Sequence, residues 1–154
     1  MPENEARVVI TNRKARHEYF ILETIEAGIV LKGTEVKSLR LGNANLQDSY
    51  AMIRQGELWL MNMHISPYAQ GNINNHPPTR TRKLLVQKKQ LRKLLARMKE
   101  KGLSLIPLSV YFKGPFAKVE LAVARGKQHH DKREAIAKRD AQREIAQRLK
   151  RSYS

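Results

Sequence analysis

The chain has 154 residues, 41% of them hydrophobic, which suffices for one compact domain and is too short for two of ordinary size. Its 30 Lys and Arg against 14 Asp and Glu give a formal net charge of +16, which favours a polyanionic partner such as RNA or DNA over a merely solubilising surface. The absence of cysteine excludes disulfides, thiolate zinc sites and thiol catalysis. The polar start Met1–Glu5 and the lack of a run of roughly 18 apolar residues predict no signal peptide, no membrane span and a cytoplasmic location.

Short strand-like runs alternate with turn signals from about residue 7 to 125. Period-two spacing predicts one buried and one wet face for each run, and it places Lys118 on a wet face. We expect a turn at Glu26-Ala27-Gly28 and a tight hairpin at Gln55-Gly56. The same spacing puts Trp59, Met61, Met63 and Ile65 on one face. The expected strands are Val8–Ile10, His17–Thr24, Gly28–Leu31, Leu46–Arg54, Glu57–Ile65, Leu108–Phe112 and Ala117–Val123.

Two helices interrupt the expected strands. The first covers Thr34–Leu41, which begins at a good N-cap residue and stops at Gly42. The second covers Lys88–Glu100, with an apolar stripe of Leu91, Leu94, Leu95 and Met98 and a stop at Gly102. The predicted fold is therefore mainly β. Residues 6–125 are expected to form a small oligonucleotide-binding-type (OB-like) antiparallel barrel with two or three embedded helices.

The composition changes after Ala124, where most of the apolar residues are alanine. On a helix, Ala141, Ile145 and Leu149 form a stripe too narrow to dock firmly on a core. We therefore expect residues 126–154 to form a basic C-terminal tail that is disordered when free and becomes helical on a partner.

The residues that an enzyme needs are sparse. Three Asp (Asp48, Asp131 and Asp140) form no ligand-like cluster, and only His129 and His130 among the histidines are close in sequence. We expect no metal, no cofactor and no enzymatic activity. A metal-free ribonuclease, whose acid and base meet only in three dimensions, stays open at this point.

Basic residues gather in three clusters, two of which include histidine. They are Arg13–His17, Arg80–Lys83 and Gly126–Arg133. Cations neutralise phosphates, and rings stack on unpaired bases. Each cluster taken alone is more often a solvated surface than a binding site, but three clusters on a chain with a net charge of +16 indicate an RNA partner.

Seven segments in order resemble the SsrA-binding protein family, SmpB. They are NRKARHEYFI (12–21), EAGI (26–29), GTEVKSLR (33–40), NLQDSYA (45–51), HISPYAQGN (64–72), RTRKLL (80–85) and GKQHHDKR (126–133). The resemblance, which spans about residues 6 to 150, implies an OB-type barrel that holds the tRNA-like domain of transfer-messenger RNA (tmRNA). It implies that this complex, with elongation factor Tu and GTP, enters the empty A site of a stalled ribosome, where translation switches to a tmRNA-encoded degradation tag.

The resemblance also implies site residues. It puts RNA contact on Glu26, Leu85 and Lys118, although Glu26 is alternatively a turn residue and Leu85 alternatively core. Gln128 stands where the family often has a second lysine. With the basic clusters added, the expected RNA-binding set is Arg13, Arg16, His17, Glu26, Lys37, Arg80, Arg82, Lys83, Leu85 and Lys118.

The tail motif is implied to meet the small-subunit ribosomal RNA at the decoding centre, with a helix continuing along the message channel and His130 stacking on a base. Its residues are Gly126, Lys127, His130, Asp131, Lys132 and Arg133. A rival hypothesis of the same chemistry is a ribosomal or initiation-type protein that stays bound to ribosomal RNA.

Overall fold

Nine strands and three short helices make up the described part of the chain. The computed structural model describes residues 6–69 and 75–127. The strands are β1 (Ala6–Thr11), β2 (Tyr19–Ile29), β3 (Ala44–Asn45), β4 (Tyr50–Arg54), β5 (Glu57–Met61), β6 (His64–Ile65), β7 (Arg82–Leu85), β8 (Leu103–Lys113) and β9 (Phe116–Gly126). The helices are α1 (Ala15–Glu18), α2 (Gly33–Arg40) and α3 (Lys88–Arg97).

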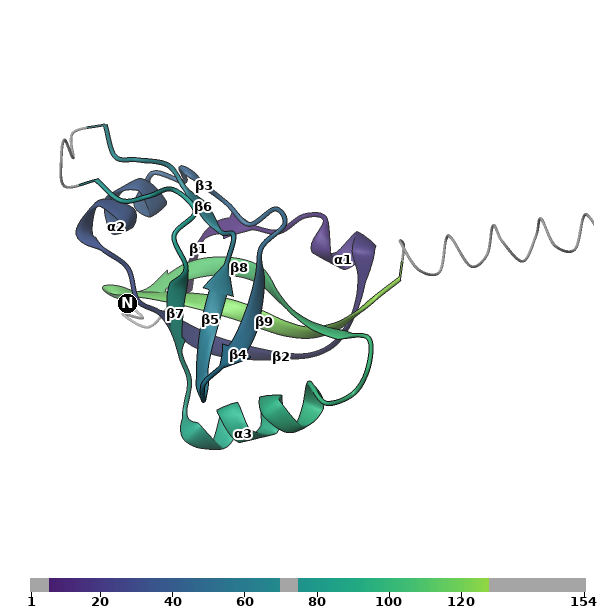
Figure 1. The fold of residues 1–154 in the computed structure, drawn as a ribbon. Helices are drawn as coiled ribbons and strands as arrows, with labels where there is room; N and C mark the ends of the chain where they lie inside the picture. Colours follow the sequence, from purple (N-terminus) through teal and green to yellow (C-terminus); the bar gives the residue numbers. More distant parts are fainter. Residues whose placement is uncertain (1–5, 70–74, 128–154) are drawn as a thin grey trace, which may run out of the picture.

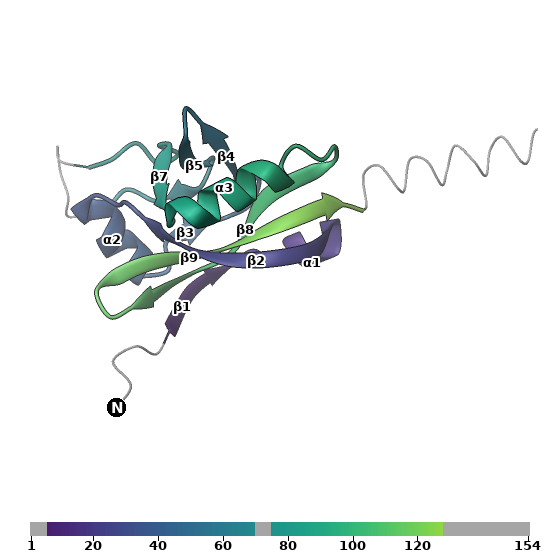
Figure 2. The ribbon, with the colours of Figure 1, turned by 90° about the horizontal axis from the view of Figure 1, so that it is seen from below.

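The main sheet closes on itself. Strands β8, β4, β5, β7, β2 and β9 pair in that order, β9 pairs back with β8, and β1 adds to the outer edge of β8. All of these pairings are antiparallel. Helix α3 lies on one side of the barrel, with α1 and α2 on the opposite side (Figure 1), and from below α3 runs across the strands (Figure 2). The predicted mainly β, antiparallel barrel with embedded helices is confirmed.

The core fills the inside of the barrel. Leu39 of α2 and Leu94 of α3 join the inward side chains of the strands, such as Leu60 and Leu121, and all four are almost completely buried. A second, smaller cluster lies outside the barrel, where Ala15 of α1 joins outward residues of β8 and β9. Because α1 covers the outer face of β8 and β9 here, both faces of these strands are buried, and the predicted alternation of buried and wet residues fails at this place.

Glycines end one helix and close one hairpin, as the sequence predicts. Gly42, directly after the C-cap Leu41 of α2, has φ of +75°, which side chains disfavour. The predicted end of the second helix at Glu100 with a stop at Gly102 is wrong: α3 ends at Arg97, and Gly102, with φ of +83°, lies in the turn before β8. Gln55 and Gly56 have φ of +53° and +74° between the paired strands β4 and β5. Two positive φ values in succession match a two-residue type I′ turn, whose twist suits the flanking strands.

The expected turn at Glu26-Ala27-Gly28 is wrong, because these residues lie inside the single long strand β2. Residues Glu23–Gly28 of β2 pair with β9 in unbroken register, and Gly28 also faces β7 on the other edge. Pairing on both edges overrides the local turn signal of a glycine. The N-terminal part of the predicted strand is also different, since Ala15–Glu18 forms α1.

The expected common face of Trp59, Met61, Met63 and Ile65 is wrong as well. Asn62 has φ of +64°, which breaks the strand between β5 and β6 and shifts the alternation by one residue. Before the break the buried side chains are Leu58 and Leu60, and after it they are Met63 and Ile65. Trp59 and Met61 therefore lie half-buried on the outer face of the barrel.

Candidate nucleic-acid interface

Five residues from five neighbouring strands form one line across the outside of the barrel. Val8 of β1 pairs with Tyr111 of β8, Tyr111 with Lys118 of β9, Lys118 with Gly28 of β2, and Gly28 with Leu85 of β7. We call this line the outer row. Gly28 has no side chain, and a Cβ atom there would lie 3.4 Å from the Cβ of Leu85. The glycine thus leaves a gap between the lysine and the leucine.

A hollow of about 270 Å³ occupies the β7 end of the outer row, where Gly28, Leu85, Phe116 and Lys118 are among its lining residues. Leu85 is 52% exposed and Phe116 is 66% exposed. The Lys118 ammonium lies 6.0 Å from the centroid of the Phe116 ring. The interpretation of Leu85 as a core residue is therefore wrong, because its neighbour Leu84 points inward instead. A cation beside exposed apolar side chains suits a phosphate with an adjoining base or ribose.

Glu26 lies beside the outer row and is held by two of its neighbours. Its carboxylate oxygen Oε2 is 2.7 Å from the Lys113 ammonium and accepts a hydrogen bond from the Tyr111 hydroxyl. Hydrogen bonds from Lys113 and then from Tyr111 lower the pKa of Glu26. Burial, and next the Glu26 carboxylate, raise the pKa of the Tyr111 hydroxyl. Glu26 thus stays charged on this face, and it does not act as a turn residue.

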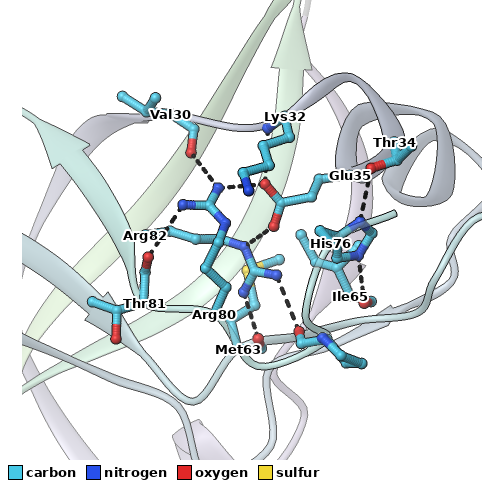
Figure 3. Close-up of polar contacts among 11 residues, drawn as sticks. Val30, Lys32, Thr34, Glu35, Met63, Ile65, His76, Arg80, Thr81 and Arg82 are labelled. Atoms are coloured by element: carbon cyan, nitrogen blue, oxygen red, sulfur yellow. Dashed lines mark hydrogen bonds and ion pairs between the residues drawn. The ribbon is translucent and has the colours of Figure 1, made fainter. Parts of the chain in front are cut away.

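Arg82 does not reach this surface, so its expected contact with RNA is wrong. Its side chain is fully buried, as is that of Glu35 on α2. The Arg82 Nε atom donates to Glu35 Oε2 at 2.5 Å, Nη1 donates to the Met63 carbonyl at 2.6 Å, and Nη2 donates to the Pro78 carbonyl at 3.0 Å (Figure 3). An arginine with these partners ties α2, β7 and the Pro78 segment together instead of contacting a ligand.

Arg80 shares the same carboxylate from the edge of the core. Its guanidinium pairs with Glu35 Oε1, which also accepts a hydrogen bond from the Lys32 backbone N–H at 2.8 Å (Figure 3). Burial alone would raise the pKa of Glu35, but the bonds from Arg80 and Lys32 and the charge of Arg82 outweigh it, so the pKa is lowered. The Arg80 side chain is 24% exposed, and its main contacts are therefore structural.

The remaining expected cations are distributed over the surface. Lys83 points outward on β7 and its ammonium is 3.1 Å from Glu57. Lys37 is exposed on α2, 5.4 Å from the centroid of the Tyr68 ring. Arg13, Arg16 and His17 are exposed at or beside α1. Strand β2 begins at Tyr19, next to α1, and Gly28 at the hollow lies near its other end. At about 3.3 Å per residue, the basic residues beside α1 are therefore roughly 30 Å from the hollow, measured along the strand.

Comparisons with known proteins identify the family. The family model described as SmpB protein matches residues 9–151. The chain belongs to the SmpB family. It is 64% identical over 146 residues to the SsrA-binding protein of Desulforudis audaxviator, covering 95% of each chain. It is 59% identical over 147 residues to that of Carboxydothermus hydrogenoformans, covering 96% of this chain and 99% of the relative.

A solved structure also resembles this member of the SmpB family. It is described as "tmRNA-SmpB: a journey to the center of the bacterial ribosome", has 53% sequence identity and a TM-score of 0.66, and the match covers 78% of this chain and 85% of that one. The likeness to a SmpB protein therefore holds in three dimensions as well as in sequence.

The first two residues of the expected tail motif belong to the barrel. Gly126 is the last residue of β9 and pairs with Tyr19, and the Lys127 N–H donates to the Glu18 carbonyl at 2.8 Å. The barrel therefore extends past the predicted boundary at residue 125. The other expected tail residues, His130, Asp131, Lys132 and Arg133, lie outside the described residues.

Three members of this surface, Tyr111, Lys113 and Phe116, carry no signal in the sequence that marks them as RNA-binding residues. Alternation along β8 predicts a wet face for Ser109 and Tyr111, but they are only 7% and 8% exposed, and their hydroxyls donate hydrogen bonds to Glu120 and Glu26. Phe116 follows the Gly114-Pro115 turn, and an aromatic residue at a strand start carries no signal of exposure. Only the pairing of β1, β8, β9 and β2 brings these side chains to Glu26 and Lys118.

No helix in residues 6–69 and 75–127 combines the length and apolar character needed to cross a membrane. In the same ranges, His, Cys, Asp and Glu side chains do not gather in groups of three or more that suit a metal ion.

Proposed function

We propose that this chain binds the tRNA-like domain of tmRNA and delivers it to stalled ribosomes for trans-translation. Membership of the SmpB family, with relatives named SsrA-binding proteins, is the observation that carries the proposal. A net charge of +16 and an outer row that combines Lys118 with exposed Leu85 support it from this chain's own residues. In this function incompletely made proteins are tagged for degradation and the ribosome is released.

The barrel acts as a rigid binding module and not as an enzyme. Lys118 neutralises a phosphate, while Leu85 and Phe116 contact the apolar face of a base or ribose beside it. Arg13, Arg16 and His17, at the other end of β2, contact a second part of the RNA or the ribosome. Elongation factor Tu joins through the tmRNA, and the process takes place in the cytoplasm, where the ribosomes are.

Binding should be selective for tmRNA and strongly dependent on salt. Each neutralised phosphate releases counterions, so the logarithm of the binding constant should fall with the logarithm of salt concentration with a slope of several units. We would measure affinity for tmRNA and for an unrelated folded RNA of equal length at several salt concentrations. Equal affinity for the two RNAs would contradict the proposal, and cleavage of tmRNA by the pure protein would identify a ribonuclease instead.

Shortening Leu85 or Lys118 should weaken RNA binding without weakening the fold. Each of Leu85→Ala and Lys118→Ala should lower tmRNA affinity about tenfold, which is about 1.4 kcal/mol, because both side chains line the hollow. Their effect on stability should stay within about 0.5 kcal/mol, as is usual for surface substitutions. Affinity and melting temperature are measured on the same samples.

Matched controls are available on α3. Leu95 is 49% exposed, close to the 52% of Leu85, and Lys93 is exposed on the same helix. Leu95→Ala and Lys93→Ala should leave tmRNA affinity unchanged. If the α3 variants weaken binding as much as the outer-row variants do, the outer row is not the RNA-binding face.

A further inference from the structure

A second line of side chains runs parallel to the outer row and is rich in hydrogen-bond acceptors. Ser109 of β8 pairs with Glu120 of β9, and Glu120 pairs with Glu26 of β2. Together with Tyr111 and Lys113 they line a groove of about 390 Å³. The groove adjoins the outer row, because Tyr111 belongs to both and Lys118 precedes Glu120 by two residues on β9.

Glu120 differs from Glu26 in the partners it has. The Glu26 carboxylate is paired with the Lys113 ammonium at 2.7 Å, whereas within residues 6–69 and 75–127 Glu120 forms no ion pair. Its Oε2 atom accepts one hydrogen bond, from the Ser109 hydroxyl at 3.3 Å. Like charges directly opposite each other on neighbouring strands are destabilising. The carboxylate of Glu120 is therefore not explained by the stability of the sheet.

A carboxylate on an RNA-binding surface discriminates between RNAs. It repels phosphates, so it weakens the binding of any RNA whose phosphate backbone is attracted to this surface only by the positive charge of the protein. It accepts hydrogen bonds from the amino groups of guanine, adenine or cytosine, whereas uracil has no amino group. Unpaired bases present these groups on their Watson–Crick edges. Repulsion of the wrong ligand together with recognition of the right one is how specificity is obtained.

We propose that Glu120 is a specificity-determining residue of the RNA-binding face, accepting a hydrogen bond from the exocyclic amino group of an unpaired base in the tRNA-like domain of tmRNA. This inference rests on the proposed function and adds a selectivity element to the outer row. Lys118 then supplies affinity for a phosphate, and Glu120, two residues further along the same face of β9, restricts which RNA fits. Ser109 of β8 and Glu26 of β2 flank Glu120 in the groove.

The test is the selectivity of a Glu120→Met variant, which removes the acceptor and the charge at similar side-chain size. The dissociation constants of the wild type and the variant are measured for the tRNA-like domain of tmRNA and for an unrelated folded RNA of equal length, at one salt concentration. Glu23→Met is the matched control, because Glu23 lies exposed on β2 and does not line the groove. Melting temperatures are measured on the same samples to show that both variants fold.

We expect the ratio of the two affinities to fall about tenfold in Glu120→Met, with the unrelated RNA bound as tightly as before or more tightly. The control should keep the wild-type ratio. If the ratio is unchanged in Glu120→Met, Glu120 is only a surface charge and the inference is overturned. If the wild type itself shows no preference for the tRNA-like domain, the proposed function fails first, so the two failures are distinguishable.

Discussion

We expect Glu35→Gln to lower the free energy of unfolding by about 3–5 kcal/mol, although the side chain keeps its shape. The amide removes the negative charge that compensates fully buried Arg82 and also binds Arg80. A buried guanidinium without a counter-ion is costly, because the interior cannot solvate it. The measurement is denaturant unfolding of the variant and the wild type. A loss below about 1 kcal/mol would show that another group compensates Arg82.

The matched control is Glu57→Gln, which removes the exposed ion pair with Lys83. The side chains of Lys83 and Glu57 are 41% and 45% exposed, so this ion pair should contribute only about 0–1 kcal/mol to the free energy of unfolding.

The stabilisation that Glu35 provides should depend on pH. Its pKa is lowered in the folded chain and returns to about 4.3 on unfolding. The contribution of Glu35 to the free energy of unfolding is therefore complete above about pH 4.3 and is lost as the pH falls through the lower pKa of the folded chain. As the pH is lowered through this range, the stability of the wild type should fall more steeply than that of Glu35→Gln.

A chain ending at Arg133 should bind tmRNA normally but fail to tag proteins on stalled ribosomes. The barrel is complete at Gly126, the last residue of β9, so the truncation removes none of its strands. We expect tmRNA affinity within about twofold of the full chain, a difference below about 0.5 kcal/mol. Tagging should fall to background, because we propose that the removed residues enter the empty message channel. We also propose that the decoding centre contacts the tail motif, which this shortened chain keeps.

Length and charge support this role for the tail. Residues 133–151 as a helix would extend roughly 28 Å at 1.5 Å per residue, long enough to follow a channel walled by RNA. The segment from residue 132 to 151 carries eight basic residues: Lys132, Arg133, Lys138, Arg139, Arg143, Arg148, Lys150 and Arg151. Changing Asp131, Lys132 and Arg133 together to alanine should reproduce the loss of tagging, whereas a control chain ending at Arg151 should tag normally. Normal tagging by the chain ending at Arg133 would show that the tail is dispensable.

The amino-acid sequence by itself determined those features that depend on near neighbours. The hairpin at Gln55-Gly56 and the stop of α2 at Gly42 follow from backbone conformations that glycine adopts without strain. The outward position of Lys118 follows from alternation along β9. Family membership was equally accessible, because the seven motifs keep their order along the chain.

Only the tertiary structure decided which basic and apolar residues face RNA. In the segment RTRKLL, composition groups Arg80, Arg82 and Lys83 as one cluster, but β7 alternates, so Arg82 points inward while Lys83 and Leu85 point outward. The counter-ion that permits a buried arginine is Glu35, 47 residues earlier in the chain. The pairing of Glu120 with Glu26 likewise joins strands at opposite ends of the sequence. Burial and charge pairing are set by such distant contacts, which local sequence patterns do not record.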